Sequence, residues 1–132
     1  MRRDRRLSAF LTLLTIVLGL ASRRFDAWLP APFHKNTGDV LWAVMVYWLA
    51  ALIFPTRSLK FLVGVSALYA VGIECSKLLH FPSLVAFRAT TMGHLVFGAV
   101  FSWADLLDYG IGLLLAALLD YRLQAPNRPS TK

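Results

Sequence analysis

Apolar and polar positions in this chain are grouped into four apolar runs separated by shorter polar breaks. The runs occupy about residues 7–22, 39–55, 59–80 and 105–120. The third run is long enough to cross the hydrocarbon core of a bilayer, since a spanning helix needs about 20 residues. The first two are shorter, and they would cross by recruiting flanking residues or by thinning the bilayer locally. The pattern therefore predicts an all-α integral membrane bundle of about four transmembrane helices.

The segments between and behind these runs predict the remaining organisation. Residues 22–39 contain two prolines and a polar turn, which indicates a loop partly embedded at the membrane interface. Residues 81–104 are apolar, but a proline and two glycines divide them into pieces too short to cross, so we expect a re-entrant or interfacial segment before the last span. A short polar tail at 121–132 follows a single transmembrane domain over 1–120.

The first apolar run follows four arginines and ends in small residues. This arrangement is typical of a first membrane span, and it also fits a cleavable signal peptide. Arg23 and Arg24 lie directly after the candidate cleavage site and are unfavourable there. We therefore expect the first span to be retained, with cleavage as the alternative.

The composition also favours a membrane protein. Of the 132 residues, 58% are hydrophobic and 16% are charged, whereas about a quarter of the residues in soluble domains are charged. The net charge of +7 does not indicate nucleic-acid binding, because the bases lie between apolar runs rather than together on one solvated surface. The single cysteine, Cys75, allows no intramolecular disulfide, and the three histidines lack the spacing of metal ligands. We expect no metal and no cofactor.

The basic residues predict an orientation, since Lys and Arg near span ends are retained in the cytoplasm. The N-terminal arm, the break between the second and third runs, and the tail together carry nine Lys and Arg, against four in the other two connections. We therefore expect both chain ends to be cytoplasmic. Residues 22–39 and 81–104 would then lie on the outer side.

Two opposite charges interrupt the third run near its predicted outer end. Glu74 is six residues before His80, which places it about 9 Å below that end on a helix rising ~1.5 Å per residue. Lys77 follows at i+3 and can pair with Glu74 or extend its ammonium towards the interface. A carboxylate inside a membrane is a functional-site hypothesis by default, and a purely structural ion pair is the alternative.

The predicted topology brings further charged residues to the same outer level. Taken singly, the two arginines that end the first run are typical interfacial anchors, and the acids that open the second and fourth runs suit helix N-termini. Together they form a candidate ligand-binding set, which consists of Arg23, Arg24, Asp39, Glu74, Lys77, Arg88 and Asp105.

The fourth run carries acids and small residues on one stripe. At spacings of three and four residues this stripe contains Asp105, Asp108, Gly112, Ala116 and Asp120. Small residues let membrane helices approach closely, so we expect a helix contact at its middle.

Several motifs of the chain resemble a known family in order and spacing. These are GLASRRF, GDVLWAVMVYWL, IECSKLLHFPSLVAFRATTMGHLVFG and FSWADLLDYGIG. The resemblance is to small bacterial membrane proteins grouped as domain of unknown function 2809, over about Leu13 to Leu119. It implies a multi-span protein of the bacterial cell envelope in the inner membrane, and it brings no catalytic assignment.

The chain is more distantly similar to the VanZ-like membrane proteins. Their pattern has a Glu and a Gln at the end of one span, an Arg in the following loop and an Asp opening the next span. Glu74, Arg88 and Asp105 match this pattern, but Lys77 stands where both families usually carry Gln. The role that the resemblance implies for that position is therefore in doubt.

Three functions are compatible with these observations. The first is a binding protein or accessory envelope subunit that holds an anionic lipid or envelope-precursor headgroup through Arg23, Arg24 and Arg88, since guanidinium groups bind phosphate with two parallel hydrogen bonds. The second is an enzyme on a lipid-linked substrate with Glu74 or Asp105 as acid or base, although adjacent Ser76 and Lys77 diverge on a helix and form no nucleophile–base pair. The third is a small transporter component, and assembly as a homo-oligomer or membrane complex stays open.

Overall fold

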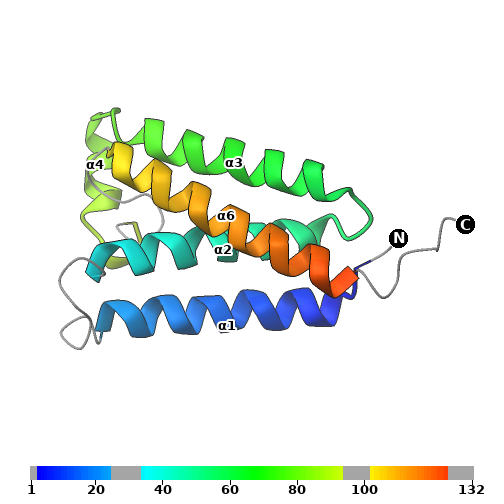
Figure 1. Cartoon of the computed structure of the whole chain (residues 1–132). Helices are drawn as coiled ribbons and strands as arrows, with labels where there is room; N and C mark the ends of the chain where they lie inside the picture. The colour runs from blue at the N-terminus through cyan, green and yellow to red at the C-terminus, as the bar shows by residue number, and fades with distance from the viewer. Residues whose placement is uncertain (1–2, 25–33, 94–101, 125–132) are drawn as a thin grey trace, which may run out of the picture.

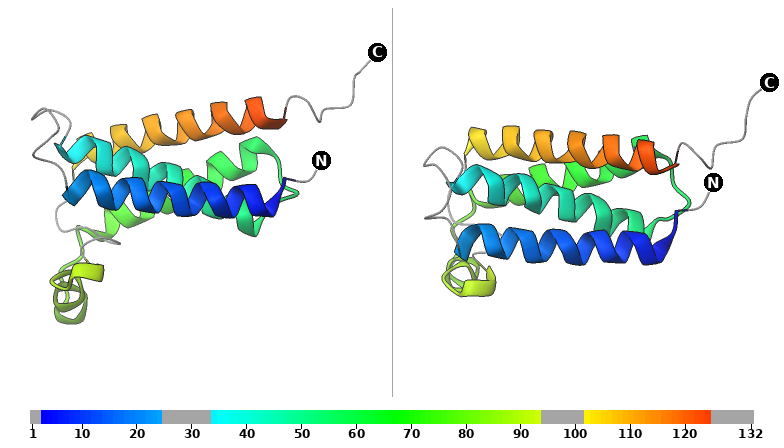
Figure 2. Two further views of the ribbon diagram at one scale, coloured as in Figure 1. Left: turned by 90° about the horizontal axis from the view of Figure 1, so that it is seen from below. Right: turned by 60° about the horizontal axis from the view of Figure 1, so that its bottom comes forward.

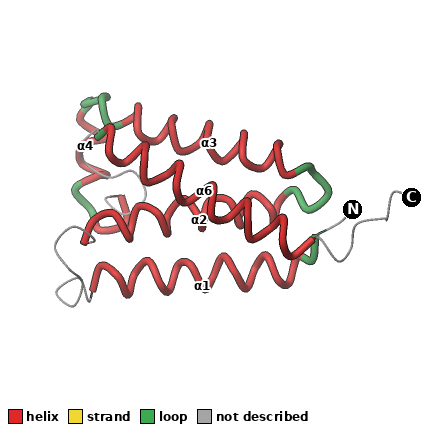
Figure 3. Tube along the Cα trace, in the orientation of Figure 1, coloured by secondary structure: helices red, strands yellow, loops and turns green. Residues whose placement is uncertain are grey.

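The structure is a computed structural model that describes residues 3–24, 34–93 and 102–124. All regular elements in these ranges are helices (Figure 3), as predicted. Their bounds are α1 Arg5–Arg24, α2 His34–Ile53, α3 Leu59–Ser76, α4 Pro82–Arg88 and α6 Trp103–Gln124. The four long helices lie side by side in a bundle, and each runs opposite to the long helix before it (Figure 1).

Helix α2 is the centre of this bundle. It packs against α1, α3 and α6, and α3 also packs against α6. The core consists of small residues alternating with large ones, among them Ala43, Tyr47, Trp48 and Ala51 of α2, Leu62 and Ala70 of α3, and Leu113 and Ala116 of α6. The small residues allow the helix axes to come close, and the large ones fill the space between them.

The predicted stripe of α6 is confirmed as its packing face. Its five members, Asp105, Asp108, Gly112, Ala116 and Asp120, are all buried. The closest approach is at Gly112, where a Cβ atom would lie 2.4 Å from the carbonyl oxygen of Val40 and 2.9 Å from Cβ of Ala43. Only a glycine lets α6 and α2 meet at this distance.

Polar side chains of α1 lie inside the bundle, while its large apolar side chains lie outside. Ser8, Thr12 and Thr15 are buried. Each hydroxyl donates to a backbone carbonyl oxygen four residues earlier, which satisfies it within the helix. The exposed large side chains of this helix include Phe10, Leu13, Val17 and Leu20. Water-soluble helices show the opposite distribution.

Two helical segments are long and apolar enough to cross a membrane, Arg5–Ser22 in α1 and Leu59–Ser76 in α3. A shorter apolar segment, Thr37–Ile53, lies in α2. By length and composition, therefore, the chain has two candidate membrane spans among its described residues.

Three helix boundaries differ from the prediction. Helix α2 begins at His34 rather than at residue 39. The stretch from His34 to Ile53 contains no proline that would interrupt a helix. Helix α3 ends at Ser76 rather than near residue 80. Helix α6 continues to Gln124, whose Nε2 donates to Asp120 Oδ1 at 2.6 Å, so the polar tail starts later than predicted. The rest of the predicted 22–39 loop and of the tail lies outside the described residues.

Helix α4 is a short helix at one end of the bundle. Pro82 occupies its first turn, where the missing N–H is not needed. It lies beside the bundle end rather than between the long helices (Figure 2), whereas residues 103 and 104 of the predicted segment 81–104 already belong to α6. The predicted interfacial position remains compatible with this arrangement.

The start of α1, the turn between α2 and α3, and the end of α6 lie together at the other end of the bundle (Figure 1). We call this the terminal end. The end that carries α4 is called the α4 end.

Candidate functional site

Buried charged residues gather at the α4 end. Helix α2 contributes Asp39, α3 contributes Glu74, and α6 contributes Asp105 and Asp108, all of them buried. Lys77, the residue that directly follows α3, is also buried. We call these five residues the acidic cluster. The predicted convergence of acids from three spans at one level is therefore present in the structure.

Lys77 joins two of the acids. Its Nζ lies 2.8 Å from Glu74 Oε2 and 3.1 Å from Asp105 Oδ2. The predicted i, i+3 pair with Glu74 is thus formed. The side chain is only 6% exposed, however, so it points inward to α6 instead of extending to the interface. The ammonium group compensates both carboxylates and ties the end of α3 to the start of α6.

Glu74 is bonded through both oxygens. Its Oε2 accepts from Lys77, and its Oε1 accepts a hydrogen bond of 2.8 Å from the backbone N–H of Ser102. Ser102 immediately precedes α6, where the first backbone N–H groups have no partner inside the helix. Glu74 therefore fixes the start of α6 as well as holding Lys77, and its side chain is fully buried.

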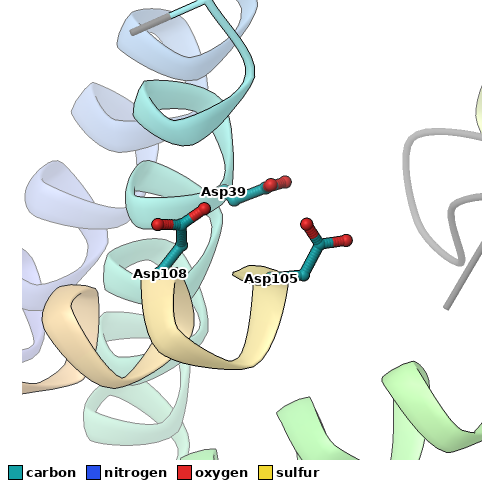
Figure 4. A group of neighbouring side chains, drawn as sticks. All are labelled: Asp39, Asp105 and Asp108. Carbon is teal, nitrogen blue, oxygen red and sulfur yellow. The ribbon is translucent and has the colours of Figure 1, made fainter. Parts of the chain in front are cut away.

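The remaining acids form a compact group. One carboxylate oxygen from each of Asp39, Asp105 and Asp108 lies within 4.8 Å of the others (Figure 4). Three carboxylates this close repel one another when ionised, and a cation near them relieves the repulsion. The group could hold a metal ion through oxygen ligands or an organic ammonium group through hydrogen bonds. The expectation that the protein binds no metal stays a prediction.

Arg88 is buried against the chain that follows α3. Its Nη1 donates to the carbonyl oxygen of Leu79 at 2.7 Å, and its Nη2 donates to the carbonyl oxygen of Ser76. Asp105 pairs with Lys77, whereas both Nη groups of Arg88 bond to backbone carbonyl oxygens, and the expected ligand contact of Arg88 stays a prediction. The carbonyl oxygen of Ser76 also accepts from the Leu79 N–H at 3.0 Å, so the Arg88 guanidinium is a second donor to it and ties α4 to the turn that follows α3.

The two predicted arginines of α1 lie at the same end. Arg24 is exposed at the last residue of α1. Arg23 belongs to the same helical turn, but its side chain is outside the described part of the structure. Their predicted contacts with a ligand therefore stay predictions.

A second buried group of charges, at the terminal end, was missed by the sequence reasoning. Arg3 Nη2 lies 2.9 Å from Asp120 Oδ2, and Tyr47 donates from its hydroxyl to the same oxygen at 2.5 Å. Arg3 Nη1 also donates to the carbonyl oxygen of Arg57. Asp120 lies at the end of an apolar run, and a buried acid requires a compensating cation. The basic N-terminal arm was the sequence feature that could have indicated this partner.

Comparison with known protein families identifies the family of this chain. The sequence model of the family described as "Protein of unknown function (DUF2809)" matches residues 28–113. The chain belongs to this family. The DUF2809 match contains all five residues of the acidic cluster, whereas Arg3 and Asp120 lie outside it. No solved structure matches the chain. The more distant VanZ-like resemblance stays a prediction.

Proposed function

We propose that this DUF2809 protein is a multi-pass protein of the bacterial inner membrane that binds an amine-bearing headgroup at the acidic cluster. In this proposal α1, α2, α3 and α6 all cross the bilayer. The observation that carries it is an inverted distribution of polarity, with charges buried inside a bundle whose outer surface is apolar. In a bilayer, ionisable groups face the bundle interior and apolar side chains face lipid.

Helix α6 supports the four-span arrangement although its acids lower its mean hydropathy. All three of those acids, Asp105, Asp108 and Asp120, are buried against other helices. The side chains it exposes are large and apolar, among them Leu107, Ile111, Leu114, Leu115, Leu118 and Leu119. A helix with this surface suits lipid, because its acids face the protein interior and its apolar side chains face outward.

The composition of the acidic cluster determines the kind of headgroup we propose. Among the described residues of the α4 end, the buried acids are Asp39, Glu74, Asp105 and Asp108, and the buried bases are Lys77 and Arg88. Lys77 bonds to two of the acids, and Arg88 bonds to carbonyl groups. A purely anionic headgroup would add to this negative charge, whereas an ammonium group would offset it.

The predicted contact of Arg23 and Arg24 with a phosphate group is compatible with an amine-bearing headgroup. Arg24 is exposed at the end of α1, on the α4 side of the bundle. A headgroup with an ammonium group and a phosphate could place the first at the carboxylates and the second at Arg24 and Arg23. The chemistry we propose is therefore an amine-bearing phosphate ester, carried by a membrane lipid or by a lipid-linked envelope precursor.

The alternative of an enzyme has less support from the geometry. The Ser76 hydroxyl donates to the carbonyl oxygen of Ile73 at 2.5 Å. Lys77 is engaged by Glu74 and Asp105. The described residues of this region thus contain no serine–lysine pair arranged for nucleophilic catalysis.

Native mass spectrometry of the purified protein tests the headgroup. Phosphatidylethanolamine, phosphatidylglycerol and a polyprenyl-linked aminosugar should be offered separately. We expect retention of at least one amine-bearing ligand, and its identity distinguishes the lipid from the precursor. Asp39→Asn and Asp108→Asn should each reduce that retention at least tenfold. Asp4→Asn is the matched control, because Asp4 is an exposed acid at the terminal end.

Two outcomes count against the proposal. One is equal retention of the amine-bearing ligand by the folded Asp39→Asn variant and the control. The other is preferential retention of phosphatidylglycerol that Arg24→Gln abolishes, which would restore the purely anionic headgroup. Unfolding midpoints in detergent identify variants that fail to fold, and Asp39→Glu provides a variant that keeps the charge.

Cysteine labelling tests the orientation. In a Cys75→Ser background, Ser83→Cys at the α4 end should react with a membrane-impermeant maleimide in intact cells. Arg57→Cys at the terminal end should react only after permeabilisation. Both positions are exposed on the protein, so protection reports the membrane side. Labelling of position 57 in intact cells would reverse the orientation.

A further inference from the structure

A set of exposed bases surrounds the terminal end of the bundle. Its members are Arg5, Arg6, Arg57, Lys60 and Arg122. We call them the basic collar. They come from the first turn of α1, the turn before α3, the first turn of α3 and the last turn of α6. These segments are distant in the sequence but share one end of the bundle (Figure 1).

The acids near the basic collar do not neutralise it. Asp120 is only 2% exposed and is bonded to the buried Arg3, to Tyr47 and to Gln124. Asp4 is exposed, but its Oδ1 accepts from the backbone N–H of Arg6 at 2.8 Å and so serves the start of α1. The surface of this end is therefore strongly positive in the described part of the chain.

Exposed aromatic side chains lie next to the bases. Phe54 and Tyr121 are both exposed, and each is within a few residues of a collar arginine. The Arg57 guanidinium lies 5.1 Å from the centre of the Phe61 ring. Aromatic rings with adjacent Arg and Lys are typical of the headgroup level of a bilayer, where the ring meets the acyl boundary and the charge meets phosphate.

We propose that the basic collar binds the headgroups of anionic phospholipids in the leaflet that surrounds the terminal end. Charge complementarity identifies the partner, since each Lys or Arg near an anionic bilayer surface strengthens binding. This inference rests on the membrane placement of the proposed function. It does not rest on the amine-bearing headgroup, because the two sites lie at opposite ends and select opposite charges.

The test compares lipid retention by variants of the two ends. We would combine Arg5→Gln, Lys60→Gln and Arg122→Gln, and measure bound phosphatidylglycerol and phosphatidylethanolamine by native mass spectrometry after equilibration in mixed-lipid nanodiscs. Phosphatidylglycerol retention should fall by at least tenfold, and phosphatidylethanolamine retention should not change. The matched control is Arg24→Gln, an exposed arginine at the α4 end, which should keep phosphatidylglycerol.

Salt provides a second readout, because contacts with exposed charges are screened within about 10 Å at 0.1 M ionic strength. Phosphatidylglycerol retention by the unmodified protein should fall as salt rises, and the triple variant should show little further loss. Equal phosphatidylglycerol retention by the triple variant and the unmodified protein overturns the inference, as does an equal loss in Arg24→Gln. Failure of the proposed function shows separately, as unchanged retention of the amine-bearing ligand by Asp39→Asn.

Discussion

Arg3 and Asp120 form a buried ion pair that joins the beginning of the chain to its last helix. Arg3 Nε donates to both oxygens of the carboxylate, at 3.1 and 2.9 Å, and Nη2 lies 2.9 Å from Oδ2. The backbone N–H of Arg3 also donates to the carbonyl oxygen of Pro55 at 2.9 Å. Three parts of the chain therefore meet at one guanidinium group.

Arg3→Ala should destabilise the protein strongly. The substitution leaves the Asp120 carboxylate buried without its cation, and breaking one side of a buried pair costs about 3–5 kcal/mol. The unfolding midpoint in detergent is the measurement, and Arg5→Ala is the matched control because Arg5 is exposed. Added methylguanidinium should partly restore the midpoint of Arg3→Ala but leave the control unchanged. A normal midpoint for Arg3→Ala would show that the pair contributes nothing.

Gly112→Ala should destabilise the contact between α6 and α2. The new methyl group would lie 2.4 Å from the carbonyl oxygen of Val40, a backbone atom that cannot turn away. Overpacking of this kind costs about 1–3 kcal/mol, which exceeds the gain of about 1 kcal/mol from replacing glycine in a helix. At Gly110 an added Cβ meets nothing within 4 Å, so Gly110→Ala should be neutral or stabilising. Equal shifts of the unfolding midpoint in Gly112→Ala and Gly110→Ala would contradict the close approach of α6 to α2.

Lys77→Gln tests the bond between α3 and α6. The VanZ-like pattern predicts that glutamine is tolerated here, but the structure shows an ammonium group shared by Glu74 and Asp105. We therefore expect a clear loss of stability, and a larger loss for Lys77→Glu, which adds a like charge. Combining Lys77→Gln with Asp105→Asn should cost less than the sum of the two single changes. Strict additivity would mean that these residues are not coupled.

Arg88→Ala should lower stability without changing lipid retention. The substitution removes the guanidinium bonds to the carbonyl oxygens of Ser76 and Leu79, and a hydrogen bond to a charged group contributes about 1.5–3 kcal/mol. Thermal unfolding and native mass spectrometry on the same sample separate the two effects. Loss of a bound headgroup at an unchanged midpoint would instead return Arg88 to the ligand-contact role that the sequence suggested.

The helical fold class and the pair of Glu74 with Lys77 could be predicted because they depend on local spacing. Apolar runs of spanning length predict helices, and the i, i+3 spacing of Glu74 and Lys77 predicts their pair. The same reasoning identified the stripe of α6 that packs at Gly112.

The partners of the long-range pairs could not be predicted in this way. Whether Asp105 bonds to Lys77 or Arg88 depends on where α3 ends and how α4 returns, and a segment without periodicity does not determine either. The pairing of Arg3 with Asp120 joins residues 117 positions apart. Spacing along one helix carries no information about such a contact.

The close contact at Gly112 fixes the middle of α6 against α2. Gly112 lies about 10 Å along the helix from Asp105 and about 12 Å from Asp120, at ~1.5 Å per residue. An ion pair holds α6 at each end, and backbone contact holds it in the middle. If a ligand drew Asp105 away from Lys77, α6 would tilt about its contact with α2 at Gly112. The tilt would strain the pair between Asp120 and Arg3. A change at the α4 end would then reach the terminal end without any long-range rearrangement of the remaining helices.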